Sequence, residues 1–253
     1  VRRMLLWMKS HVEGMRSFVY YVARLFDTET IGETEEERQA AKDMIELLTP
    51  IVKSYCSDRG FDITVQAMQV YGGYGYITEY PVERLMRDSK IHSLYEGTNG
   101  IQAMDLLGRK MAMKQGAVFM NFLGEIQQVI ARAKETEGLS ESAGQMETVV
   151  NRLGEVAMQL GTMAMSADYK AAFGHASPFL TAMGDVIMGW MLLWRATIAA
   201  PRLAELTQGL DHAARLEKIN KNKNAAFYEG QVKSAEYFIH TILPITMGNL
   251  NSI

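Results

Sequence analysis

The sequence predicts an all-α protein, and three observations support this fold class. Apolar residues recur with the helical period along most of the chain. The apolar and polar alternation that is typical of strands is almost absent. Only five prolines occur in 253 residues, so long segments are free of helix breakers. We therefore expect an antiparallel helix bundle followed by a second helical domain.

Turn-forming segments separate the helices that we expect. These helices span residues 2–27, 34–57, 60–71, 81–93, 99–114, 116–135, 141–173, 178–206 and 211–247. The segments between them are TETIGET, YGGYGYITEYP, EGLSES, FGHASP and TQGLD. The SDRGF segment after Cys56 leaves open whether the helix ends or kinks there. The motif-rich part gives way to methionine-rich and alanine-rich helices near 110–118, which divides the chain into domains at 1–114 and 115–253.

Composition and charge exclude several classes of function. The net charge of -3, with both signs interspersed, provides no basic surface for nucleic acid. The single cysteine, Cys56, excludes an intrachain disulfide and fits a reducing cytoplasm. The most apolar segment, 178–201, contains Asp185 and Arg195, and its uninterrupted apolar part is shorter than the roughly 18 to 20 residues that cross a bilayer. We expect a buried helix there rather than a membrane span.

The first residues continue an amphipathic pattern that is already under way at Val1, so we expect the N-terminal part of a longer protein to precede them. A dinucleotide-binding fingerprint is not supported, because Thr78 replaces the third glycine after Gly73 and Gly75, and a helical segment precedes them. The five histidines show no metal-ligand spacing, so no metal site is expected. They are His11, His92, His175, His212 and His240.

Two segments are more specific than composition explains: MQVYGGYGYITEYPVERLMRDSKI at 68–91 and LYEGTNGIQ at 94–102. Together they resemble the C-terminal helical domain of flavin-dependent acyl-CoA dehydrogenases. That family carries Q-hydrophobic-aromatic-G-G-x-G, E-Y-P-hydrophobic-E-[KR], M-R-D-[AS]-K and Y-E-G-T in this order. The resemblance covers about residues 1–111. The remainder is similar to the additional helical domain of a bacterial subgroup that includes fatty-acyl-CoA and methylmercaptopropionyl-CoA dehydrogenases.

The resemblance implies that Glu96 is the catalytic base, which removes the α-proton of an acyl-CoA thioester while the β-carbon passes hydride to N5 of FAD. The product is a trans-2-enoyl-CoA. Tyr95, Glu96 and Gly97 would contact the substrate, and the Glu96 backbone N–H would donate to the thioester carbonyl. A carboxylate suits this step if burial raises its pKa, and Leu94 and Tyr95 are the expected apolar wall. The alternative is an ordinary loop carboxylate at a helix start.

The same resemblance implies two groups of FAD-binding residues. Gln69, Gly72 and Gly73 would contact the adenosine pyrophosphate of the FAD in a neighbouring subunit, although they also fit an ordinary C-terminal helix cap. Thr98 and Asn99 would contact the flavin of their own subunit, and Asn99 departs from the serine or glutamine that is common there. Thr98 is also the expected N-cap of the following helix.

The family further implies a homodimer or homotetramer that acts in fatty acid β-oxidation and passes electrons to an electron-transfer flavoprotein. We expect the 253 residues alone to be inactive. The competing interpretation is a non-enzymatic helical oligomerisation or interaction module derived from the same family. Decay of function would alter Glu96 or the glycines first, and all of them are intact. The sequence leaves open the acyl-chain length, the electron acceptor and the role of residues 115–253.

Overall fold

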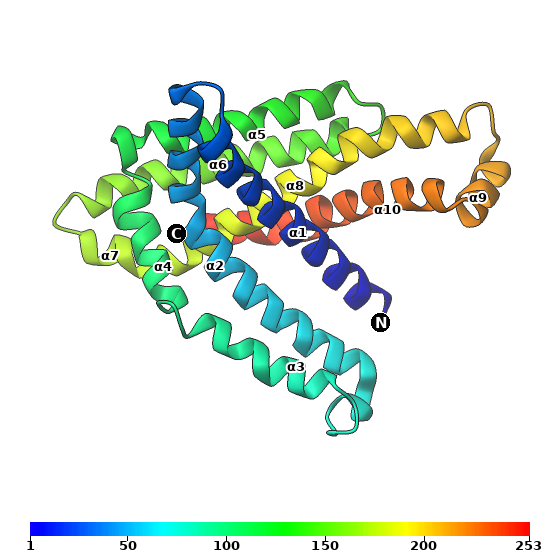
Figure 1. Cartoon of the computed structure of the whole chain (residues 1–253), viewed down its shortest axis with the longest axis horizontal. Helices are drawn as coiled ribbons and strands as arrows, with labels where there is room; N and C mark the ends of the chain where they lie inside the picture. Colours follow the sequence, from blue (N-terminus) through cyan, green and yellow to red (C-terminus); the bar gives the residue numbers. More distant parts are fainter.

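The computed structural model describes residues 1–253 and contains no strand, which confirms the all-α prediction (Figure 1). The α-helices are α1 (Arg2–Ile31), α2 (Glu35–Tyr71), α3 (Val82–Ser89), α4 (Asn99–Asp105), α5 (Ala117–Glu135), α6 (Ser140–Ala164), α7 (Tyr169–Gly174), α8 (Ala176–Thr207), α9 (His212–Lys221), α10 (Lys223–Tyr237) and α11 (Leu243–Ser252). Short 3₁₀ segments are η1 (Gly72–Gly75), η2 (Lys90–Ser93) and η4 (Met113–Gly116). Two π-helical segments are η3 (Leu106–Lys110) and η5 (Phe238–Ile242).

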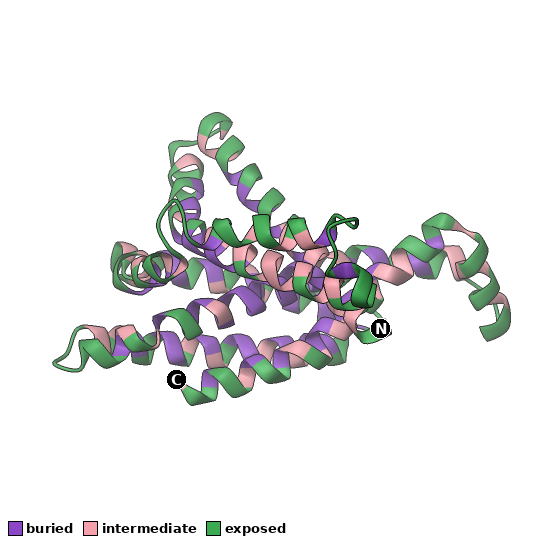
Figure 2. Ribbon diagram, turned by 90° about the horizontal axis from the view of Figure 1, so that it is seen from below, coloured by how far each residue is buried: buried purple, intermediate pink, exposed green.

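Helix α8 is the central helix of the fold. It packs against α1, α2, α5, α6, α10 and α11, and Figure 2 shows how burial concentrates in the interior of the helix assembly. Its length and hydropathy would be sufficient for a membrane span, but 83% of its most apolar window is buried in this fold. The expected buried helix is therefore present.

One hydrophobic core joins helices from both halves of the chain. It joins Leu47 of α2, Phe122 of α5 and Val186 of α8, each of which is fully buried. The core therefore includes residues from both sides of the expected boundary near 110–118. The division into domains at 1–114 and 115–253 stays a prediction.

Of the two alternatives left open for SDRGF, the helix end at residue 57 is wrong, because α2 continues to Tyr71. A glycine inside a helix costs only about 1 kcal/mol relative to alanine, so Gly60 does not suffice to end it. Arg59 forms an ion pair with Asp62 at 3.0 Å within the same helix, which supports the backbone on both sides of Gly60. The SDRGF segment is thus helical throughout.

Two other predicted helices were too long. The helix expected at 141–173 ends at Ala164, and the Ser166 hydroxyl accepts a hydrogen bond from the Asp168 N–H at 3.1 Å. Such a local bond competes with helical hydrogen bonding. The helix expected at 211–247 is interrupted at Asn222, whose side-chain oxygen accepts from the next turn and caps α10.

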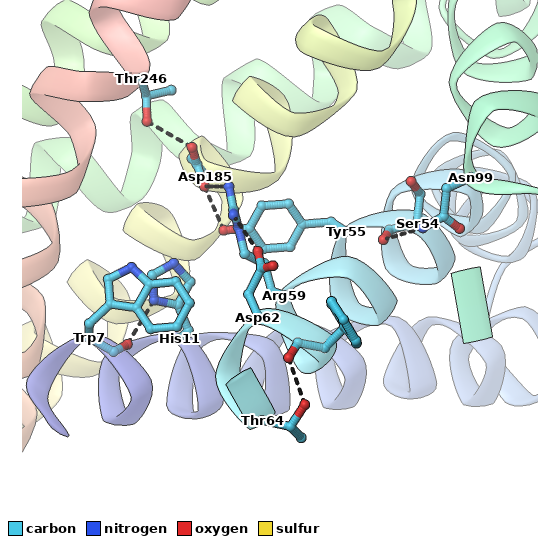
Figure 3. A network of polar contacts seen from close by, with 11 residues as sticks. Trp7, His11, Ser54, Tyr55, Arg59, Asp62, Thr64, Asn99, Asp185 and Thr246 are labelled. Atoms are coloured by element: carbon cyan, nitrogen blue, oxygen red, sulfur yellow. Dashed lines mark hydrogen bonds and ion pairs between the residues drawn. The ribbon is translucent and has the colours of Figure 1, made fainter. Parts of the chain in front are cut away.

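A buried carboxylate joins α2 to the C-terminal helices (Figure 3). Asp185 of α8 is 4% exposed. It accepts hydrogen bonds from the hydroxyls of Tyr55 at 2.6 Å and Thr246 at 2.9 Å, and the Arg59 guanidinium lies 3.6 Å away. Burial raises the pKa of Asp185, while the Arg59 charge and the two hydroxyl donors act in the opposite direction.

The helices α2 and α8 approach each other closely at this carboxylate. A Cβ atom on Gly184 would lie 2.1 Å from the Tyr55 ring, so only glycine fits beside that ring. The Arg59 guanidinium carbon lies 5.3 Å from the centre of the same ring. The contact therefore fixes the position of α2, which also carries Lys53, Ser54 and Ser57.

We predict that Asp185→Ala lowers the free energy of unfolding by about 3 to 5 kcal/mol. The substitution removes the buried carboxylate that pairs with the Arg59 charge. Chemical denaturation followed by circular dichroism measures the difference. The matched control is Asp62→Ala, which removes the more exposed carboxylate on Arg59 and should cost about 1 kcal/mol or less. Equal losses for the two variants would contradict the role given to Asp185.

A second prediction concerns His11, which is 1% exposed on α1. Its Nδ1–H donates to the Trp7 carbonyl at 2.8 Å, and its ring packs against Phe238. Burial lowers the pKa of His11 to about 4, and the Arg59 charge acts in the same direction, against the hydrogen bond to Trp7. As the pH falls, His11 therefore becomes protonated at a higher pH in the unfolded chain than in the folded chain.

The contribution of His11 to stability should be complete above its ordinary pKa of 6.5 and should be lost as the pH falls toward about 4. The expected loss is about 3 kcal/mol. Chemical denaturation of the wild type and of His11→Leu at several pH values measures the contribution of His11 to this loss of stability. If both proteins lose stability in parallel over this range, His11 does not titrate as proposed.

Candidate functional site

The predicted catalytic segment lies in the loop between η2 and α4. Glu96 has φ 56° and Gly97 has φ 80°, so two successive residues adopt left-handed backbone conformations. Such a φ is uncommon for a residue with a side chain, and it persists where the surroundings hold it. Thr98 then caps α4, because its hydroxyl accepts from the Ile101 N–H at 3.4 Å. The N-cap prediction for Thr98 is confirmed.

The substrate-facing residues that the sequence predicts are exposed in the chain. Glu96 and Gly97 are exposed, and Leu94 and Tyr95 retain 54% and 48% of their surface. No hydrogen bond or ion pair of the chain involves the Glu96 carboxylate. Leu94 and Tyr95 do not bury this carboxylate by themselves, so its desolvation stays a prediction that depends on further protein or substrate.

Side chains and a backbone carbonyl of α2 bind this loop through hydrogen bonds. The Lys53 ammonium donates to the Gly97 carbonyl at 2.6 Å and to the Asn99 side-chain oxygen at 2.8 Å. The Asn99 amide group donates to the Ser54 carbonyl at 3.2 Å and lies 2.9 Å from the Ser57 hydroxyl. Figure 3 shows Asn99 facing Ser54 on the same helix that carries Tyr55 and Arg59. The Asn99 side chain is thus bound to α2, while the role predicted for Asn99 toward flavin stays a prediction.

The other predicted cofactor segment lies at the far end of α2. Gln69, Gly72 and Gly73 are exposed, and a Cβ atom on either glycine would meet nothing within 4 Å. Gly72 ends the helix with φ 64°. Gln69 follows Lys53 by 16 positions, which corresponds to about 24 Å along the helix axis. The structure therefore separates the two predicted groups of residues within one chain.

The surface grooves include two of nearly equal volume. One has a volume of about 950 Å³ and lies between α2 and α3, and it reaches Leu94 beside the loop that carries Glu96. Its walls are Phe61, Met68, Tyr76, Glu83, Met86, Arg87, Asp88, Lys90, Ile91 and Leu94. The other, of about 960 Å³, lies between α1, α2 and α5 and contains none of the predicted site residues.

Sequence reasoning missed three residues that support the loop: Lys53, Ser54 and Ser57. The segment KSYCS contains small polar residues within an amphipathic helix, which indicates a polar partner but does not identify it. Their partner, Asn99, lies more than 40 positions away in the sequence. Only the packing of α4 against α2 brings them together.

Comparison with known proteins gives matches over nearly the whole chain. Residues 1–112 match the family described as acyl-CoA dehydrogenase, C-terminal domain, and residues 122–253 match the family described as acetyl-CoA dehydrogenase C-terminal like. A butyryl-CoA dehydrogenase of Syntrophomonas wolfei is 35% identical over 98% of this chain and 38% of its own length. The broad-specificity linear acyl-CoA dehydrogenase FadE5 of Mycobacterium tuberculosis is 30% identical over 97% of this chain and 39% of its own length. The chain thus spans less than half of the length of these relatives.

Two solved structures share the fold at low sequence identity. The crystal structure of Caenorhabditis elegans ACDH-11 in complex with C11-CoA has a TM-score of 0.71 and 18% identity, and the match covers 93% of this chain and 35% of that one. An acyl-CoA dehydrogenase of Bacillus anthracis, complexed with FAD, has a TM-score of 0.55 and 19% identity over 98% of this chain and 44% of that one. With both family matches spanning nearly the whole sequence, the chain belongs to the acyl-CoA dehydrogenase family.

Proposed function

We propose that the chain is the C-terminal part of a longer acyl-CoA dehydrogenase and that Glu96 is its catalytic base. The observation that carries the proposal is the presentation of Glu96. Its carboxylate is exposed and unpaired on a left-handed turn, and the carbonyl of the next residue is bound by Lys53. A carboxylate that serves only as a helix cap would accept a backbone N–H, whereas Thr98 performs that function here.

The residues of this chain would perform the proton transfer. Glu96 accepts the α-proton of the thioester, while the Glu96 backbone N–H donates to the thioester carbonyl and stabilises the developing negative charge. Gly97 adopts φ 80°, which favours glycine, and carries no side chain between the loop and the thioester. Tyr95 contributes a half-exposed aromatic ring beside the acyl group. Further protein over this loop in the longer enzyme would exclude water from the proton transfer.

FAD fits the exposed residues of this chain. Gly72 and Gly73 offer a backbone without side chains, where a pyrophosphate can approach closely, and Thr98 and Asn99 lie next to the base. When bound, FAD supplies N5 as the acceptor of the hydride that leaves the β-carbon. The separation of about 24 Å along α2 supports completion of the site by Gln69, Gly72 and Gly73 of a neighbouring subunit. A homodimer or homotetramer satisfies this requirement by symmetry.

We further propose an electron-transfer flavoprotein as the acceptor of the electrons and a cytoplasmic location. The acceptor is proposed from family membership, and the location from the single cysteine, which fits a reducing compartment. The names of the relatives include butyryl-CoA and broad-specificity linear acyl-CoA dehydrogenases, so a panel of straight-chain acyl-CoA thioesters is the appropriate set of test substrates.

The test is Glu96→Gln in the longer enzyme with bound FAD. The amide preserves the shape of the side chain and the backbone N–H but accepts no proton, so flavin reduction should slow by at least about a hundredfold. Binding of FAD and acyl-CoA should change by no more than about threefold, because the loss falls on the chemical step. Anaerobic stopped-flow bleaching of the flavin measures the rate.

The matched control is Glu36→Gln, at an exposed glutamate on the first turn of α2 that lies far from the loop. It should reduce flavin at the wild-type rate. If Glu96→Gln bleaches within about threefold of the wild type, Glu96 is not the base. If no acyl-CoA of the panel reduces the flavin of the wild type, the non-enzymatic interaction module becomes the better account.

A further inference from the structure

The two carbonyl groups of the Glu96–Gly97 turn are each held by a side chain. The Lys53 ammonium donates to the Gly97 carbonyl at 2.6 Å, and the Gln102 amide donates to the Glu96 carbonyl at 3.4 Å. The first contact is short and charge-assisted, whereas the second is long for a hydrogen bond. Lys53 is therefore the stronger of the two restraints on this left-handed turn.

Lys53 also binds the side chain that follows the turn. The same ammonium donates to the Asn99 side-chain oxygen at 2.8 Å, so one group spans residues 97 to 99. The Asn99 amide nitrogen is in turn bound to α2 by Ser54 and Ser57. Gly97 and Asn99 are thus both bound to the same segment of α2.

This arrangement restrains the backbone that carries the Glu96 side chain. The Gly97 carbonyl belongs to the peptide between Gly97 and Thr98, and the Glu96 carbonyl belongs to the preceding peptide. The two hydrogen bonds therefore limit the backbone rotations that would move the Glu96 carboxylate. A general base must lie within hydrogen-bonding reach of the proton that it removes, and a displacement of about 1 Å can cost a hundredfold in rate.

We propose that Lys53 is a positioning residue, which holds the Glu96–Gly97 turn from α2 and thereby aims the Glu96 carboxylate at the substrate, with Asn99 as its side-chain partner. The inference rests on the proposed function of Glu96. Lys53 contributes no proton to the reaction in this account. It acts through the backbone of the loop.

Lys53 is suited to a test by chemical rescue. Its side chain is partly exposed, and its two acceptors lie in an exposed loop. Lys53→Ala removes the ammonium from this loop and leaves a space that a small alkylammonium ion can enter. The matched control is Lys42→Ala, an exposed lysine on the same helix that forms no hydrogen bond or ion pair.

The first experiment is stopped-flow flavin reduction in the longer enzyme with bound FAD at saturating acyl-CoA. Lys53→Ala should lower the rate constant about ten- to hundredfold, with acyl-CoA affinity changed by no more than about threefold. Ethylammonium should raise the rate constant in proportion to its concentration, and neutral ethanol should not. A purely structural role would lower the amplitude, through loss of bound flavin, and leave the rate constant of the remaining enzyme unchanged.

The second experiment needs no activity. In a crystal structure of the Lys53→Ala variant, the Gly97 carbonyl should turn away from α2, and Glu96 should leave the left-handed region. An unchanged loop conformation overturns the proposal, as does a wild-type rate constant or a loss that ethylammonium does not restore.

The two proposals fail in different ways. A wild type that acyl-CoA does not reduce, or a Glu96→Gln variant that remains fast, removes the proposed function, whereas the crystal structure still decides whether Lys53 holds the turn. If Glu96→Gln is inactive and Lys53→Ala reduces flavin like Lys42→Ala, only the role of Lys53 is overturned.

Discussion

The buried carboxylate of Asp185 is the constraint on which the arrangement of the helices depends. A carboxylate that is 4% exposed in the middle of an apolar helix is costly unless it is fully paired. It obtains its partners from two other helices, through Tyr55 and Arg59 of α2 and Thr246 of α11. The three helices can satisfy it only in one relative position. The C-terminal helices therefore do more than extend the hydrophobic core, because they also fix α2.

Helix α2 connects this constraint to the proposed active site. Lys53, Ser54 and Ser57 bind the loop that presents Glu96, and Tyr55 and Arg59 bind Asp185. All five residues lie within two turns of one helix. A displacement of α2 at Asp185 is thus transmitted to the loop by a rigid element. This connection gives residues 115–253, whose role the sequence left open, a physical link to Glu96.

The fold class and the motif residues could be predicted from the sequence because both have local signatures. Helical periodicity reports each helix by itself, and the Thr98 cap follows from the residue type and the helix start that follows it. The helix ends near Ser166 and Asn222 were missed because single side-chain hydrogen bonds determine them. Periodicity alone does not indicate whether such a hydrogen bond ends the helix or whether the helix continues.

The support of the site could not be predicted, because its contacts join distant parts of the chain. Lys53 reaches Asn99 across 46 positions, and Tyr55 reaches Asp185 across 130. Asp185 in the apolar segment was recognised as an argument against a membrane span, but nothing in the sequence identifies its partners. The left-handed conformation of Glu96 was likewise not expected, since residues with side chains rarely adopt it.

Amide hydrogen exchange tests most directly whether Asp185 fixes the Glu96 loop through α2. Mass spectrometry would follow peptides that cover residues 94–99 in the wild type, in Asp185→Asn and in the control Asp62→Asn. We predict faster exchange in this loop for Asp185→Asn alone, together with faster exchange in α2, since local opening follows the loss of the contacts that hold a segment. Unchanged exchange at 94–99 in a variant whose α2 and α8 exchange faster would contradict it.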